Sequence, residues 1–146
     1  MSQPDSKQRD EQATFARFIQ RLDSHNEWAG ISSRPEPEPH LLCIHLTEGP
    51  IAFQLVSLTN PTIAEIQAAA PETLDHIIQN TFNKAYDTDA LHIELLLHTD
   101  DRIDTPDDVI IPILTPLFGS MPHPFKRVWF MGEQTTCHLW QTDQVS

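Results

Sequence analysis

The sequence contains little cysteine and little glycine, and its apolar runs are short. Cys43 and Cys137 form no Cys-x-x-Cys pair, so a disulfide is not required and two buried thiols are the simpler interpretation. Four glycines hardly suffice for a phosphate loop or a dinucleotide fingerprint, and no Gly-x-Ser-x-Gly elbow is present. No run reaches the roughly 18 apolar residues of a membrane span, and the N-terminus lacks a signal-peptide core. These absences predict a cytoplasmic protein without a cofactor or a recognisable catalytic motif.

Basic residues are also scarce, with nine against 21 acidic ones and a net charge of −12. This charge opposes binding to nucleic-acid phosphates and to anionic membranes. The whole excess lies between Pro35 and Asp108, where fourteen carboxylates accompany only Lys84 and Arg102. Solubility is the simplest explanation, but unbalanced carboxylates also steer cationic partners.

The order of apolar patterns predicts a single α+β domain over residues 1–146, with an antiparallel or mixed sheet of about five strands and helices packed on one face. Residues 1–9 are expected to be disordered, and residues 31–40 to form a Pro-rich strut. The helices are predicted over Glu11–His25, where Ala29-Gly30 follows as a stop, over Asn60–Ala70 with Asn60 as N-cap, and over Pro71–Tyr86. The strands are predicted over Leu41–Leu46, Ile51–Leu58, Leu91–His98, Lys126–Met131 and Thr135–Gln141.

Two of these segments carry more specific expectations. The strand Leu91–His98 is the most apolar and should be central in the sheet. After the helix start at Thr105-Pro106, Pro112 and Pro116 oppose a regular helix, so one or two helical turns and then irregular chain are expected over residues 109–124. The passage from Leu91 to Phe118 resembles the strand, acidic loop and helix of phage tail-terminator proteins; this resemblance covers less than a quarter of the chain and assigns no residue a role.

The concentrated carboxylates favour a non-catalytic module that binds a basic protein partner: an inhibitor, an immunity protein or a chaperone-like adaptor. Carboxylates of the partner-binding patch would pair with lysine and arginine on that partner. The patch is predicted to comprise Asp87, Asp89, Glu94, Asp100, Asp101, Asp104, Asp107 and Asp108.

A small metal-dependent enzyme is the main alternative. His92, Glu94 and His98 would share one face of a strand and offer the ligand types of zinc and non-haem iron sites. Neighbours on a straight strand diverge, however, so a polar strand face explains them more simply. The aspartate-rich loop lacks the central glycine of an EF-hand, and the cysteines lack a visible activating base.

Aromatic residues gather in the last predicted hairpin. Trp129, Met131 and Trp140 form a candidate hydrophobic docking face, unless the first helix covers them. If that face is used between copies of the chain, the protein would be a homo-oligomeric phage or secretion assembly subunit.

Overall fold

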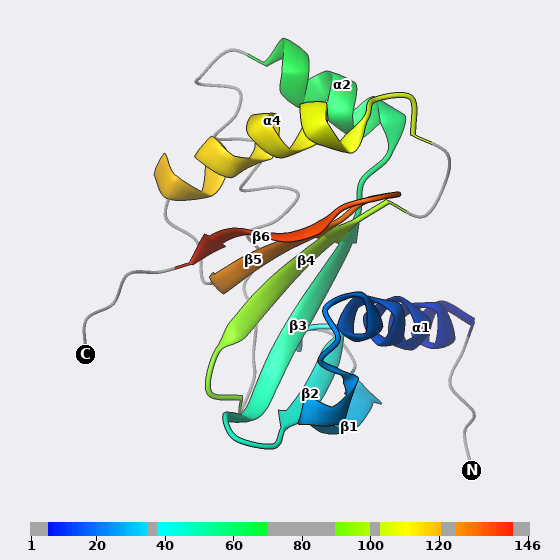
Figure 1. Cartoon of the computed structure of the whole chain (residues 1–146), viewed down its shortest axis with the longest axis vertical. Coiled ribbons are helices and arrows are strands. Elements are labelled where there is room, and N and C mark those ends of the chain that lie inside the picture. Colours follow the sequence, from blue (N-terminus) through cyan, green and yellow to red (C-terminus); the bar gives the residue numbers. More distant parts are fainter. Residues whose placement is uncertain (1–5, 35–37, 70–89, 100–102, 121–124, 142–146) are drawn as a thin grey trace.

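The computed structural model describes residues 6–34, 38–69, 90–99, 103–120 and 125–141 (Figure 1). The described strands form one mixed sheet, and their order in space is their order in the chain. They are β1 (Trp28–Ser33), β2 (Leu41–His45), β3 (Gly49–Ser57), β4 (Ile93–His98), β5 (Phe125–Met131) and β6 (Thr136–Gln141). The described helices are α1 (Ser6–Arg21), the single 3-10 turn η1 (His25–Glu27), α2 (Asn60–Ala68) and α4 (Asp107–Ser120).

Two parallel pairings lie at the centre of the sheet. β4 runs parallel to both β3 and β5, whereas the outer ladders β1–β2, β2–β3 and β5–β6 are antiparallel. Parallel neighbours require crossover connections, and α2 and α4 belong to the two crossovers that enter and leave β4. The α+β fold with a mixed sheet is therefore confirmed, with β1 as a further strand.

Helices cover both faces of the sheet, rather than the one face that the sequence suggested. On one face, α2 and α4 lie together and pack against strand residues such as Leu95, Leu97 and Val128. On the other face, Phe15 and Phe18 of α1 contact a separate buried cluster. Because both faces are covered, all six residues of β4 are buried, as expected for a central strand.

The N-terminal part of the chain departs most from the sequence prediction. α1 begins at Ser6, so the part of residues 1–9 that the structure describes is helical. The Ala29-Gly30 pair does not stop a helix but lies in β1, which pairs with β2 and also takes the first residues of the expected 31–40 strut. The six residues of β1 mix polar and apolar side chains, so their sequence predicts a strand only weakly. They form a strand because they pair with the apolar strand β2.

α4 also differs from its prediction, because it continues for 14 residues through Pro112 and Pro116. Both prolines are exposed, so the interrupted side of the helix faces solvent. Ile110, Leu114 and Leu117 lie on the opposite side and are buried in the sheet's core. Burial of this apolar stripe offsets the hydrogen bonds that the prolines remove.

The boundaries of β2 to β6 and of α2 agree closely with those predicted from the sequence. The two hairpins and β4 are found where they were predicted, and Thr59 rather than Asn60 caps α2, through a hydrogen bond from the Thr62 N–H. The helix predicted over Pro71–Tyr86 and the end of the 109–124 segment lie outside the described residues. Among the described helices, none is both long enough and apolar enough to cross a membrane.

Candidate functional site

His92, Glu94 and His98 are not assembled as metal ligands in the structure. His92 and Glu94 meet, with 2.7 Å between Nε2 and Oε2, but His98 is buried near the far end of β4. On a regular strand, about 20 Å separates positions 92 and 98. Within the described ranges, no three histidine, cysteine, aspartate or glutamate side chains are grouped to hold a metal ion.

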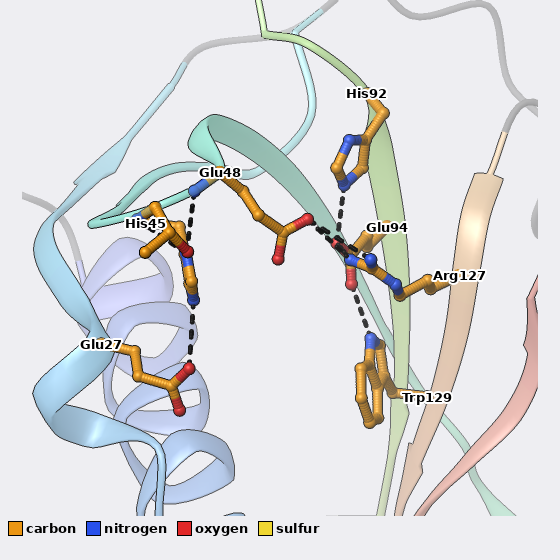
Figure 2. Close-up of polar contacts among 8 residues, drawn as sticks. Glu27, His45, Glu48, His92, Glu94, Arg127 and Trp129 are labelled. Atoms are coloured by element: carbon orange, nitrogen blue, oxygen red, sulfur yellow. Dashed lines mark hydrogen bonds and ion pairs between the residues drawn. The ribbon is translucent and has the colours of Figure 1, made fainter. Parts of the chain in front are cut away.

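Glu94 is instead the centre of a buried polar network (Figure 2). Its side chain is almost fully buried, and Oε2 accepts a hydrogen bond from Arg127 Nη1 at 2.8 Å. The indole Nε1 of Trp129 donates to Oε1 at 2.7 Å. Glu94 lies opposite Arg127 in the β4–β5 register, so strand pairing itself brings the two charges together.

This network keeps Glu94 ionised. Burial by itself raises the pKa of the carboxyl, but the hydrogen bonds from His92 and Trp129 and the positive charge of Arg127 outweigh it. The pKa of Glu94 is therefore lowered from its ordinary value of 4.5. With these donors the carboxylate links β4 to β5, and its side chain is only 3% exposed, which leaves little of it to contact a partner.

A second polar group follows the β2–β3 turn. His45 Nδ1 accepts hydrogen bonds from the backbone N–H groups of Thr47 and Glu48, at 3.2 and 3.1 Å. This leaves the ring proton on Nε2, which lies 3.4 Å from Glu27 Oε1. Glu48 in turn contacts Arg127, with 3.3 Å between Oε1 and Nη2. Arg127 therefore joins the turn to the Glu94 network (Figure 2).

The structure divides the predicted acidic patch. Glu94 lies in the buried network, on the face of the sheet that α1 covers. Asp87, Asp89, Asp100 and Asp101 lie outside the described residues. Asp104, Asp107 and Asp108 do come together, at the start of α4.

These three aspartates line a cleft of about 500 Å³, which we call the acidic cleft. The turn between β5 and β6 forms its other wall and contributes a carboxylate that the sequence analysis missed, Glu133. Asp104, Asp108 and Glu133 are exposed. The described lining contains no lysine, arginine or histidine; its remaining residues are Thr99, Ile103, Thr105, Pro106, Gln134 and Thr135.

Asp107 holds the two walls of the acidic cleft together. Its Oδ2 accepts hydrogen bonds from the backbone N–H groups of Gln134 and Thr135, at 2.9 and 2.8 Å. Gly132 permits this approach, because a Cβ there would overlap the Asp107 carboxylate. Arg21 of α1 supports the same turn by donating from Nη1 to the Gly132 carbonyl oxygen. The cleft is thus built by tertiary contacts rather than by one flexible loop.

The predicted aromatic docking face is also divided. Trp129 and Met131 belong to the cluster that α1 covers, whereas Trp140 packs against the cluster beneath α2 and α4. The first helix therefore covers Trp129 and Met131 but not Trp140. The three side chains form no common surface. The homo-oligomer that this face was expected to support stays a prediction.

The two cysteines are unsuited to nucleophilic chemistry. Cys43 is fully buried, and burial, followed by the negative charge of Glu94, raises the pKa of its thiol. Burial and the nearby Asp107 carboxylate raise the pKa of Cys137 as well. A raised thiol pKa lowers the population of the reactive thiolate at neutral pH.

Comparison with known proteins adds no assignment, since no family model, curated protein or solved structure matches the chain. Functional inference therefore depends on the geometry alone.

Proposed function

We propose that the protein is a non-catalytic binding module that engages a basic protein partner through the acidic cleft. The observation that carries this proposal is the convergence of Asp104, Asp108 and Glu133 from two segments far apart in the sequence. Their charges are exposed, and the described lining contains no lysine, arginine or histidine; Arg21, outside the lining, binds the backbone carbonyl oxygens of Gly132 and Glu133. Such a site attracts lysine or arginine side chains at long range and pairs with them after contact.

The architecture of the cleft suits a protein partner. One wall is the segment 103–108 that leads into α4 and the other is the connection between β5 and β6, and Asp107 joins them by accepting two backbone hydrogen bonds. A pre-formed acceptor surface loses little conformational entropy when it binds. Inhibitors, immunity proteins and chaperone-like adaptors act in this way, by covering a basic surface without chemical change.

The test is the association rate of a short oligo-arginine peptide, measured by stopped-flow at several ionic strengths. Steered association slows steeply as salt screens the charges. The double variant Asp104→Asn/Glu133→Gln should slow association more than the matched control Asp10→Asn/Glu65→Gln, which removes two exposed carboxylates outside the cleft.

Two results would count against the proposal. A rate that does not change with salt would remove the electrostatic mechanism. Equal effects of the two double variants would show that net charge, and not the cleft, attracts the peptide.

A further inference from the structure

A second cavity, of about 360 Å³, lies between α1 and the sheet and is separate from the acidic cleft. Its volume falls within the range of small-molecule sites, which begins at roughly 300 Å³. We call it the aromatic pocket, because its lining includes Phe18, Trp28, Phe53 and Trp129. The polar residues in its lining include Glu27, His45, Glu48 and Arg127, which Figure 2 shows with Glu94 and Trp129.

The accessible aromatic surface of this pocket belongs to the two tryptophans. Phe18 and Phe53 are about 1% exposed and lie behind them, whereas Trp28 and Trp129 are only partly buried. Trp28 contacts Phe53 with 5.8 Å between ring centroids, and Trp129 contacts Phe18 at 5.4 Å. The buried phenylalanines thus hold the indole rings in place.

Neither indole offers its N–H group to a ligand. Nε1 of Trp129 donates to Glu94, and Nε1 of Trp28 is closed off from solvent, without a hydrogen-bond partner among the described residues. At the two indoles, a molecule in the pocket therefore meets ring carbon rather than a hydrogen-bond donor. The faces of such rings carry partial negative charge and attract cations.

The charges around the pocket favour a cation as well. Arg127 compensates the buried Glu94, and the Nδ1 of His45 is occupied by the backbone N–H groups of Thr47 and Glu48. Glu27 and Glu48 remain, and their side chains are 57% and 38% exposed. Each has a partner at Oε1: His45 for Glu27, and Arg127 for Glu48. The pocket therefore combines indole walls with two accessible carboxylates.

We infer that the aromatic pocket binds a small organic ammonium ion, with its apolar body against Trp28 and Trp129 and its charged group beside Glu27 and Glu48. Indole faces and carboxylates are the groups that recognise such cations, whereas an anion would be repelled by both. This inference does not depend on the acidic cleft, so either site can fail its test without the other.

The experiment uses three probes of similar shape: phenethylammonium, neutral 2-phenylethanol and anionic phenylacetate. Each is titrated into the ¹⁵N-labelled full chain, which has three tryptophans and hence three indole N–H signals. The signals of Trp28 and Trp129 should shift with phenethylammonium, while that of Trp140, on the opposite face of the sheet, serves as an internal reference. We expect phenethylammonium to bind about tenfold more tightly than 2-phenylethanol.

Variants separate recognition of the charge from packing. Glu27→Gln/Glu48→Gln should remove most of this tenfold preference and leave binding of 2-phenylethanol unchanged; Glu65→Gln, on α2, should alter neither. Equal affinities for all three probes in the wild-type protein, tighter binding of phenylacetate, or shifts in none of the pocket tryptophans would overturn the inference. Retention of the full preference in the double variant would overturn it too.

Discussion

Replacement of Glu94 by glutamine should destabilise the protein by about 3 kcal/mol. The wild-type carboxylate accepts hydrogen bonds from His92, Arg127 and Trp129, and each hydrogen bond to a buried charged group contributes roughly 1.5–3 kcal/mol. Breaking a buried ion pair typically costs about 3–5 kcal/mol. Glutamine keeps one carbonyl oxygen and Arg127 keeps Glu48, so the lower end of that range applies.

Urea denaturation followed by circular dichroism measures this loss. With an m-value of about 2 kcal/mol/M, 3 kcal/mol lowers the midpoint by about 1.5 M. The control is Glu65→Gln, an exposed position at which a change within about 0.5 kcal/mol is expected. If Glu94→Gln were equally mild at pH 7, the buried network would not contribute about 3 kcal/mol to the stability of the protein.

The same variant has a defined pH dependence. Because the folded protein lowers the pKa of Glu94 below 4.5, the network contributes its full stability above that pH. This contribution is lost as the pH falls through the folded pKa, where the carboxylate takes up a proton. The difference in unfolding free energy between the wild-type protein and Glu94→Gln should therefore shrink below about pH 4.5. A difference that grows on acidification would contradict the assignment.

Three further predictions concern the rest of the molecule. Asp107→Ala should cost about 2 kcal/mol and accelerate hydrogen exchange of the Gln134 and Thr135 amides, which lose their acceptor; unchanged exchange would contradict this. Pro112→Ala should raise the unfolding free energy by about 1–3 kcal/mol, because it restores an N–H in the exposed middle of α4, and a lower melting temperature would show that the proline is needed. Cys43 should resist a disulfide reagent at pH 8 in the native protein and react after denaturation, as read by peptide mass spectrometry; rapid native labelling would show that the thiol is accessible.

Local signals account for the elements that the sequence predicted well. The β2–β3 and β5–β6 hairpins join apolar strands through short turns, and both lie where these patterns place them. β4 was recognisable as a central strand because it is the most apolar of the predicted strands, with Ile93, Leu95 and Leu97 on one face. Here the residues that decide the structure are neighbours in the chain.

The candidate sites were harder to predict from the sequence than the strands were. Glu94 is the one carboxylate in its strand, and Arg127, which follows Lys126, precedes an apolar run, so that signal could have suggested a buried pair. The sequence could not show that their strands are adjacent and in register. Likewise, Glu133 joins the acidic cleft only because Asp107 binds the turn that follows β5.

By itself, the sequence determined the hairpins, the apolar central strand and the excess of negative charge, since these follow from composition and from short-range periodicity. Tertiary structure decided that α4 continues through its prolines, that Trp28–Ser33 pairs as an edge strand, and which carboxylates are buried or exposed. Those outcomes depend on apolar burial and hydrogen bonding between segments distant in the chain. A short stretch of sequence shows neither which distant segments bury its apolar side chains nor which ones form hydrogen bonds with it.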